Sequence, residues 1–421
     1  MRLVGLGVAT LLVGLGAATL LLAGCAAPAQ TPTPLSPLPP SPSGSADGPA
    51  TPEIALGPVQ PAGSPADIAT GLALPWSIAF TTDGIALVSE RDTALIKEVA
   101  PDGTVRQVGR VPDVVPGGEG GLLGLAVLEP GSALEPGSAL KPSSALKPSA
   151  APEPGSVSAG RYLYAFITAA NDNRIVRMPL TGATGSYALG APEVVLAGIR
   201  KAENHNGGRI KFGPDGMLYA TTGDASNSSS SQDPGSLNGK ILRMTPDGEA
   251  PANNPTSGSL VYSLGHRNPQ GIAWDADGQL WAAEFGQNTW DEINRITPGA
   301  NYGWPVVEGV GGDPAYVNPV HQWSTSEASP SGLAFTRGTF FLAALRGERV
   351  WVIDAARSSG PPSSGQGVGV VPYFQGQYGR IRDVAVAPDG SIWMLTSNTG
   401  RAPRAGDDRI VRVQLAPVID G

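Results

Sequence analysis

Six Asp-Gly pairs recur between residues 83 and 390 of this 421-residue chain, and four of them stand between two apolar runs. The four segments are SIAFTTDGIALVSE, IKFGPDGMLYATTGD, GIAWDADGQLWAAEFG and VAVAPDGSIWMLTS. Asp-Gly between apolar runs is a strong hairpin signal, because glycine accepts the positive φ of a tight turn. A hairpin that recurs over this length predicts a repeated all-β unit. If every repeat begins its inner strand at the same end, the polar residues just before these strands must meet at one face.

The number of strand-like runs predicts the kind of repeat. Roughly twenty such runs lie between residues 72 and 415, and no segment keeps a helical period beyond two turns. Glycine (57 residues) and proline (41 residues) are abundant, which suits short strands and tight turns. A β-propeller uses about four strands per blade, so the chain is expected to form five or six blades. We expect the last run, residues 408–415, to join the first blade and close the ring.

The N-terminus has the pattern of an export signal. Arg2 precedes an apolar stretch that ends in Leu-Ala-Gly before Cys25, which is the only cysteine of the chain. A basic start, an apolar segment and small residues predict a signal peptide over residues 1–24. The Leu-Ala-Gly-Cys sequence resembles the bacterial lipoprotein motif. We therefore expect an exported protein at the cell surface or on the periplasmic side, anchored by lipid on Cys25 without spanning the membrane. An ordinary secreted signal or a single membrane-spanning anchor is the alternative.

The rest of the chain divides into a tether and one large domain. Residues 25–66 are rich in Pro, Ser, Thr and Ala, which predicts a semi-extended tether. Residues 67–421 are the predicted propeller domain. Inside it, residues 129–159 repeat EPGSAL and KPSSAL, which predicts a low-complexity surface insert. The net charge of −8 argues against nucleic acid or an anionic membrane surface as a partner.

Polar residues precede several of the predicted inner strands. His205, Asn268 and Arg382 precede their Asp-Gly pairs by ten, nine and seven residues, and Glu119 precedes a strand run that has no such pair. In a propeller these positions surround the mouth of the central channel. Arginine there suits a polyanionic ligand, since guanidinium binds carboxylates in a bidentate fork, and histidine accepts a proton at neutral pH. For any one of these residues, the alternative is a rim residue that satisfies turn backbone.

One further segment has the composition of a calcium site. Glu284, Asp291 and Glu292 lie within nine residues and are followed by glycine-rich turns. Carboxylates and free main-chain carbonyls supply the all-oxygen shell that Ca²⁺ prefers. The histidines at 205, 266 and 321 lack the spacing of transition-metal ligands and have no thiol partner.

Eight segments, in chain order from about residue 72 to 414, resemble the glucose/sorbosone dehydrogenase family. They are LPWSIAF, GEGGLLGLAV, NHNGGRIKFGPDGMLYATTGD, SLNGKILRMTPDG, GHRNPQGIAWD, DEINRITPGANYGWP, PSGLAF and GRIRDVAVAPDG. That family contains the soluble aldose dehydrogenases that depend on pyrroloquinoline quinone (PQQ). The resemblance implies a six-bladed β-propeller with PQQ over the channel mouth beside Ca²⁺. It also implies oxidation of an aldose sugar at C1 to its lactone, with electrons passed to an acceptor that the sequence does not identify.

The resemblance also implies roles for particular residues. His205 matches the general base, and Arg267 matches the residue that polarises the quinone oxygen. The positions implied to contact the cofactor are Glu119, Arg267, Asn268, Arg346, Arg380 and Arg382. The positions implied to hold metal are Gly286 and Gln287, for the Ca²⁺ of the cofactor, and Glu292 and Tyr302, for a neighbouring structural Ca²⁺.

Some positions depart from the family pattern. Glu119 stands where some members carry Gln, Arg346 where the best-known members carry Lys, and Gln287 where they carry Pro. Asn204 stands where some members carry Asp, so a carboxylate that orients His205 is expected to be missing at that position. Two other functions stay open. One is a calcium-dependent propeller lactonase, against which the arginines at the mouth argue. The other is a non-enzymatic propeller that binds PQQ or sugar without turnover.

Overall fold

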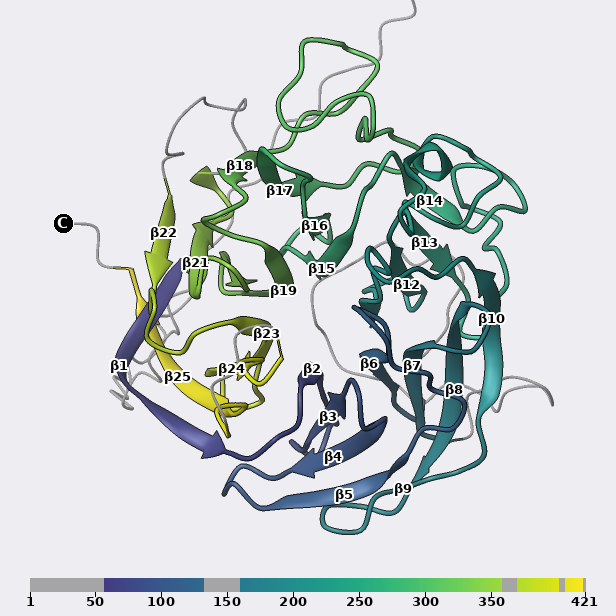
Figure 1. The fold of residues 1–421 in the computed structure, drawn as a ribbon. Helices are drawn as coiled ribbons and strands as arrows, with labels where there is room; N and C mark the ends of the chain where they lie inside the picture. The colour runs from purple at the N-terminus through teal and green to yellow at the C-terminus, as the bar shows by residue number, and fades with distance from the viewer. Residues whose placement is uncertain (1–56, 132–159, 358–368, 401–405, 419–421) are drawn as a thin grey trace, which may run out of the picture. The chain divides into compact units, whose positions relative to one another are not determined.

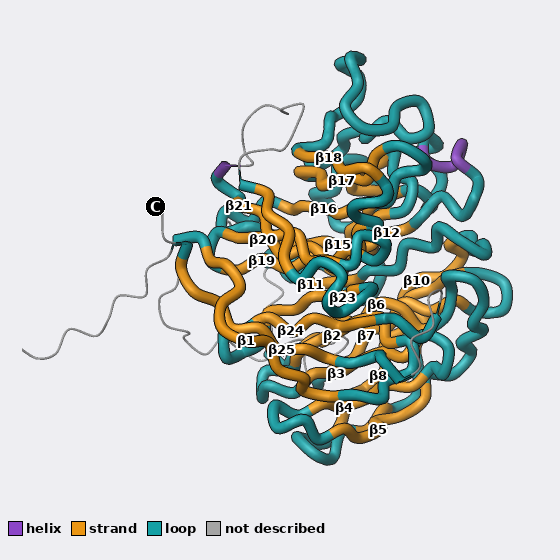
Figure 2. The backbone as a smooth tube through the Cα atoms, turned by 60° about the vertical axis from the view of Figure 1, so that its left-hand side comes forward, coloured by secondary structure: helices purple, strands orange, loops and turns teal. Residues whose placement is uncertain are grey.

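The computed structural model describes residues 57–131, 160–357, 369–400 and 406–418. The predicted signal peptide, Cys25, the tether up to residue 56 and most of the 129–159 insert lie outside these residues. The described residues form an all-β propeller in which six antiparallel sheets surround a central channel (Figure 1). Strands and loops make up almost all of it (Figure 2). Within these ranges, no helix has the length and apolar character needed to cross a bilayer.

The first three blades follow one another along the chain, and each begins with its innermost strand. Blade 1 contains β2 (Pro75–Phe80), β3 (Ala86–Glu90), β4 (Leu95–Val99) and β5 (Val105–Arg110). Blade 2 contains β6 (Leu122–Leu128), β7 (Tyr162–Thr168), β8 (Asn173–Thr181), the short β9 (Ala188–Leu189) and β10 (Glu193–Ile199). Blade 3 contains β11 (Ile210–Phe212), β12 (Leu218–Thr222), β13 (Lys240–Met244) and β14 (Val261–Leu264). A 3₁₀ turn (Ser228–Ser231) lies between β12 and β13.

The other three blades repeat this order. Blade 4 contains β15 (Pro269–Trp274), β16 (Leu280–Glu284), β17 (Trp290–Arg295) and β18 (His321–Ser324). Blade 5 contains β19 (Pro330–Thr336), β20 (Thr339–Ala344), β21 (Arg349–Asp354) and β22 (Val370–Tyr373). Blade 6 contains β23 (Ile381–Val386), β24 (Ile392–Thr396), β25 (Ile410–Pro417) and β1 (Val59–Ala69).

The ring closes in blade 6, and this differs from the sequence-based expectation. β1 pairs antiparallel with β25, so that Val59 lies opposite Pro417 and Ala69 opposite Ile410. The prediction that residues 408–415 join the first blade is therefore wrong, because β25 pairs with the preceding strand β24 and completes the last blade. β1 also begins inside the segment predicted as a tether, which moves the start of the propeller to Val59. Its sequence, VQPAGSPADIA, is half-buried or exposed between its two buried ends and lacks the alternation of a typical strand.

The Asp-Gly pairs form the turns that the sequence predicts. The glycines of all six pairs have positive φ, between 75° and 89°. Four of these glycines stand in the turn between the innermost and the second strand of a blade: Gly84, Gly216, Gly278 and Gly390. The repeated hairpin is thus the inner half of a blade, which confirms the predicted repeat.

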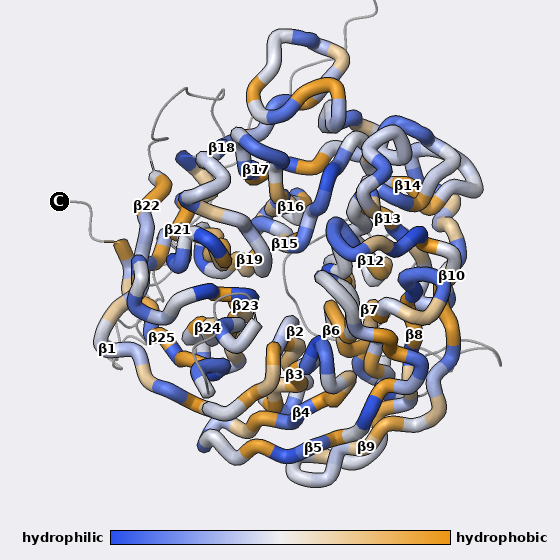
Figure 3. Tube along the Cα trace, viewed as in Figure 1, coloured by the Kyte–Doolittle hydropathy of each residue, from blue (hydrophilic) through white to orange (hydrophobic). Residues whose placement is uncertain are grey.

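The hydrophobic core lies between blades. Buried apolar side chains form one cluster at each of the six interfaces between neighbouring sheets. Aromatic pairs cross several interfaces; Trp281 of blade 4 meets Phe340 of blade 5 with ring centroids 4.9 Å apart. Hydrophobic residues follow the blade strands while many connecting loops are hydrophilic (Figure 3). Because both faces of a blade are covered, the core holds the six inner strands in fixed positions around the channel.

Candidate active site

The six innermost strands begin at the same end of the channel, and the residues before them meet there. Leu74, Asn268, Ser329 and Arg380 each stand immediately before an innermost strand, while Glu119 and His205 stand three and five residues before theirs. All six residues line one cavity of about 600 Å³. The expected convergence of residues upstream of the inner strands is therefore present in the fold.

Nine of the eleven predicted site residues line this cavity: Glu119, His205, Arg267, Asn268, Gly286, Gln287, Arg346, Arg380 and Arg382. The other two, Glu292 and Tyr302, lie instead in a smaller adjoining pocket, to which Arg267 and Gly286 also contribute. The structure thus places the two residues predicted for the neighbouring metal outside the main cavity.

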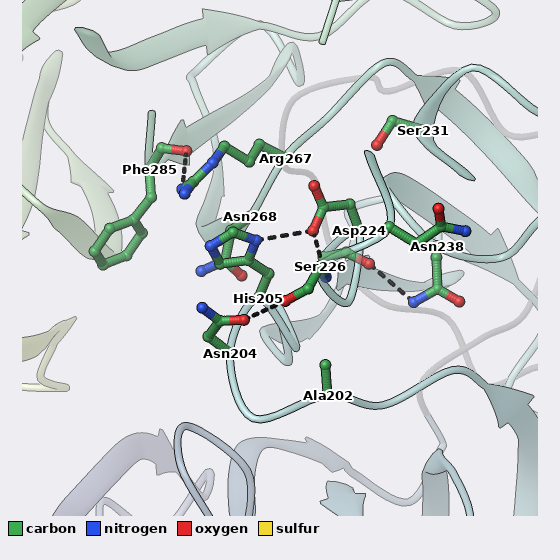
Figure 4. A network of polar contacts seen from close by, with 12 residues as sticks. Ala202, Asn204, His205, Asp224, Ser226, Ser231, Asn238, Arg267, Asn268 and Phe285 are labelled. Atoms are coloured by element: carbon green, nitrogen blue, oxygen red, sulfur yellow. Dashed lines mark hydrogen bonds and ion pairs between the residues drawn. The ribbon is translucent and has the colours of Figure 1, made fainter. Parts of the chain in front are cut away.

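His205 is fixed by contacts to its main chain and to its ring. Its φ of 57° lies in the left-handed region, which is uncommon for residues other than glycine. Its amide N–H donates to Glu119 Oε2 at 2.9 Å, and its Nδ1 lies 2.8 Å from Asp224 Oδ1 (Figure 4). A carboxylate partner makes Nδ1 the donor, so Nε2 carries the free lone pair. Among the described residues, Nε2 has no hydrogen-bond partner.

Asp224 supplies the carboxylate that the sequence interpretation expected to be missing. The expectation assumed that this group would come from position 204, whereas the carboxylate that faces His205 follows β12 in the segment TTGD. Asn204 instead accepts a hydrogen bond from Ser226 (Figure 4). Burial opposes ionisation of Asp224, but hydrogen bonds from His205, from the Trp304 indole at 2.9 Å and from the Ser226 amide outweigh it. Together they hold the pKa of Asp224 below its usual value.

Asn268 also supports the histidine segment. Its side chain is 2% exposed, and its Oδ1 accepts the amide N–H of Gly207 at 3.0 Å. With Glu119 bound to the amide of His205, two side chains from neighbouring blades hold the backbone around the histidine. Both residues were expected to contact the cofactor, and in this structure both position His205.

Two arginines of the cavity have unmet hydrogen-bonding capacity. Arg267 has its guanidinium 5.5 Å from the centre of the Trp304 ring, and Arg382 donates to Gln270 Oε1 at 2.8 Å. The Nε atoms of both arginines are buried without a partner among the described residues. Burial lowers the pKa of both groups, and the nearby Arg380 and Arg91 lower that of Arg382 further. This end of the channel therefore favours an anion.

A buried ion pair contacts two residues that line the cavity, Trp76 and Gln270. Arg209, 1% exposed, donates to Asp383 Oδ2 at 2.8 Å and to the carbonyl of Gln270 at 2.9 Å. Its guanidinium lies 4.3 Å from the centre of the Trp76 ring, which also faces Arg382 at 5.8 Å. Sequence reasoning missed Trp76 and Gln270, although both stand within two residues of the start of an inner strand.

The segment predicted to bind calcium lies beside the cavity. Glu308 accepts four successive amide N–H groups, from Gln287 to Trp290, and Asp291 accepts that of Gly286. No hydrogen bond to the carbonyl oxygens of Gly286 and Gln287 is found in the described part of the chain.

The adjoining pocket is rich in carboxylates. Burial raises the pKa of Glu292 to about 8, and the nearby Glu284 carboxylate adds to this effect. The Tyr302 hydroxyl donates to the Arg295 carbonyl at 2.6 Å and accepts the Thr297 amide, so a metal-binding role for Tyr302 would use its main-chain carbonyl. Within the described ranges, no three His, Cys, Asp or Glu side chains are placed to hold a metal ion on their own.

Comparison with known proteins shows which family the chain resembles. The sequence profile of the glucose/sorbosone dehydrogenase family matches residues 72–131 and 157–404. The chain belongs to this family. The aldose sugar dehydrogenase YliI of Escherichia coli is 32% identical over 355 residues, which cover 77% of this chain and 87% of that protein. The family and the six-bladed fold implied by the sequence segments are thus confirmed.

Two further known proteins are similar to the chain. Quinoprotein glucose dehydrogenase B of Acinetobacter calcoaceticus is 31% identical over 282 residues, or 59% of this chain. The match spans 54% of that protein, about half of its length. The solved PQQ-bound form of the aldose sugar dehydrogenase from Streptomyces coelicolor is 46% identical, with a TM-score of 0.71. That comparison covers 86% of this chain and 99% of the other.

Proposed function

We propose that this chain oxidises an aldose sugar at C1 to the lactone with PQQ as its cofactor. The observation that carries the proposal is the His205–Asp224 pair, which faces a cavity where the buried Nε atoms of Arg267 and Arg382 have no hydrogen-bond partner among the described residues. The similarity to quinoprotein glucose dehydrogenase and to aldose sugar dehydrogenases supports the same reaction.

The cavity residues fit a quinone that carries carboxylates. Arg346, Arg380 and Arg382 line one part of the cavity and would hold the carboxylates, since guanidinium binds them in a bidentate fork. Arg267 lies near His205 (Figure 4) and would polarise the quinone oxygen that gains charge. When bound, the quinone supplies the acceptor for the hydride that leaves C1 of the sugar.

The protein residues carry the proton transfer. Nε2 of His205 accepts the proton of the C1 hydroxyl, because Nδ1 is engaged with Asp224. The ionised Asp224 keeps the imidazole in this tautomer and stabilises the imidazolium that forms. Trp304 holds the second oxygen of Asp224, so the carboxylate stays aligned with the ring.

We also propose that Ca²⁺ binds beside the cofactor, as the family resemblance implies. The carbonyl groups of Gly286 and Gln287 have no hydrogen-bond partner in the described part of the chain, and oxygen donors of this kind suit Ca²⁺. Glu292 and the main-chain carbonyl of Tyr302 would serve a neighbouring structural Ca²⁺ beside Glu284 and Glu308. Added Ca²⁺ should raise the melting temperature of chelator-treated protein more than Mg²⁺ does.

We propose further that lipid on Cys25 anchors the exported protein, as its LAGC segment suggests. The Cys25→Ala variant should move from the membrane fraction to the soluble fraction. A membrane-bound Cys25→Ala protein would count against the anchor.

A single reconstitution experiment separates the candidate functions. The full chain is mixed with PQQ and Ca²⁺, and its absorption spectrum is recorded before and after addition of a panel of aldoses. Sugar-dependent reduction of the cofactor supports the dehydrogenase. Tight PQQ binding without reduction would indicate a non-enzymatic propeller. Lactone hydrolysis that needs Ca²⁺ but no PQQ would indicate a lactonase.

Two histidine variants test whether His205 is the general base in the reconstituted protein. His205→Ala should abolish turnover and leave PQQ binding largely intact. His321 lies on the outer strand β18 and does not line the cavity, so His321→Ala is the matched control and should behave like the wild type. Full turnover by His205→Ala would refute the assignment of the base.

A further inference from the structure

A second cavity, of about 400 Å³, opens where the innermost strands end. All six strands contribute to it near their C-terminal ends: Phe80, Val127, Phe212, Trp274, Phe335 and Val386. The two cavities share no lining residue. The buried Arg209–Asp383 ion pair lies in the channel, between the inner strands of blades 3 and 6. The second cavity is therefore separate from the candidate active site.

Of the residues that the structure describes, Lys211 is the only charged one that lines this second cavity, which we call the far cavity. Its Nζ donates to the Leu333 carbonyl at 2.8 Å, and an ammonium group has three donors. No carboxylate lies within ion-pair distance of Lys211 among the described residues. The carboxylate that acts on Lys211 electrostatically is that of Asp383. Its Oδ2 already accepts a hydrogen bond from Arg209 at 2.8 Å. Burial lowers the pKa of Lys211 to about 8; Asp383 opposes this effect and Arg209 adds to it.

The far cavity combines apolar side chains with one cation, Lys211, and this combination restricts the chemical class of its ligand. Ligand sites are typically concave and apolar with a few polar groups that set orientation. A neutral apolar ligand would cover the ammonium without giving it a partner, which costs free energy. A phosphate or a dicarboxylate would bring more negative charge into the far cavity than one lysine neutralises. A single carboxylate on an apolar body satisfies both the walls and the lysine.

We propose that the far end of the channel is a second ligand site, which binds small amphiphilic monocarboxylates with the carboxylate on Lys211 and the apolar body against the strand ends. This site does not depend on the proposed sugar oxidation.

Titration calorimetry on the full chain with octanoate and octan-1-ol tests the proposal. These probes share one apolar chain and differ in the carboxylate. Octanoate should bind at one site, with a dissociation constant at least about tenfold lower than that of octanol, as expected for a charge-assisted hydrogen bond. Absence of saturable octanoate binding, or equal affinity for the two probes, would overturn the proposal.

Two lysine variants locate the carboxylate. Lys211→Met keeps an unbranched side chain one atom shorter, removes the charge, and should weaken octanoate binding to the level of octanol. Lys211→Arg keeps the charge and should retain most of the affinity. For the wild type, octanoate affinity should fall as the pH rises from 7 to 9.5, because the ammonium loses its proton; Lys211→Arg should not show this fall. Unchanged octanoate binding by folded Lys211→Met contradicts the assignment.

A variant of the wall keeps the test valid if the lysine variants fold poorly. Ala385 lines the far cavity, and Ala385→Leu narrows it without removing a charge. This variant should lose octanoate and octanol binding together, while PQQ binding at the other end stays unchanged. Retention of full octanoate affinity by Ala385→Leu would place the ligand elsewhere and refute the site.

Discussion

His205 occupies a backbone conformation that a histidine rarely adopts, and the contacts around it offset the strain. Glu119 holds its amide, Asp224 holds its ring, and the Ala225 amide donates to its carbonyl at 3.1 Å. Strained residues of this kind persist where the surroundings determine them, and they concentrate at functional sites. We infer that this backbone conformation places Nε2 of His205 where a general base is needed.

Asp224→Asn should lower kcat by a factor of about 100 or more, because the amide no longer stabilises the imidazolium or selects the tautomer. The PQQ dissociation constant should change little. Dye-reduction kinetics and absorbance titration measure the two quantities.

Asn204→Asp is the matched control for this variant. It restores the carboxylate that some family members carry, but Asp224 already fills that role, so kcat should not rise. A large gain in kcat for Asn204→Asp would mean that Asp224 does not orient the histidine.

Acid stability provides a second test of Asp224. Its pKa lies below the ordinary value of 3.8, so its contribution to folding is present above that value and is lost as the pH falls through the lower folded pKa. The free energy of unfolding should therefore drop less between pH 7 and pH 2.5 for Asp224→Asn than for the wild type. Urea titrations at both pH values measure this difference, and equal drops would contradict it.

The position of a strand in its blade decides whether its sequence can be recognised as a strand. Inner and middle strands such as β12 and β24 are fully buried and read as apolar runs. Outer strands such as β5 and β10 are half or more exposed, so their sequences show no continuous apolar run. Cross-strand pairing with an inner neighbour, rather than local propensity, holds these segments extended.

β1 gives a direct test of ring closure. A chain that begins at Gly57 keeps the strand and should melt like the longer protein. A chain that begins at Gly71 lacks it, leaves the edge of β25 unpaired, and should melt at a clearly lower temperature and associate through that edge. Thermal unfolding and light scattering measure both effects. Equal stability of the two chains would restore the interpretation of this segment as a tether.

Over the whole molecule, the net charge and the charge of the cavity have opposite signs. The chain carries a net charge of −8, yet the cavity is lined by five arginines: Arg91, Arg267, Arg346, Arg380 and Arg382. Because the blades bring residues from distant parts of the chain to one channel mouth, the local charge cannot be read from composition.

Arg380→Ala should raise the PQQ dissociation constant about tenfold or more, since a hydrogen bond to a charged group contributes about 1.5–3 kcal/mol. Arg110→Ala, at the end of the outer strand β5 and away from the cavity, should leave it unchanged. Absorbance titration at low and high salt measures both variants, and affinity should fall with added salt. Equal constants for Arg380→Ala and the wild type would refute the assigned role.

The hairpin turns, the repeated blade and the residues that surround the channel mouth could be predicted without the structure, because each depends on a short stretch of chain. The positive φ of an Asp-Gly turn is a local property, and His205, Asn268 and Arg382 lie seven to ten residues before such turns, near the starts of inner strands that meet at one end of the channel. The family resemblance added Arg267, within the segment GHRNPQGIAWD, and Arg346, where the best-known members carry Lys.

The pairings needed the folded ring. Asp224 contacts His205 only because β11 and β12 of blade 3 pair antiparallel, which brings the residue before one strand beside the residue after the other. Trp304 contacts Asp224 although the two are 80 residues apart in the chain. Arg209 meets Asp383 across 174 residues, and β1 meets β25 across nearly the whole described chain. Contacts of this kind depend on how many blades close the circle and in which register. A local pattern carries no information about that closure, because burial and pairing are set by neighbours that the chain meets only after folding.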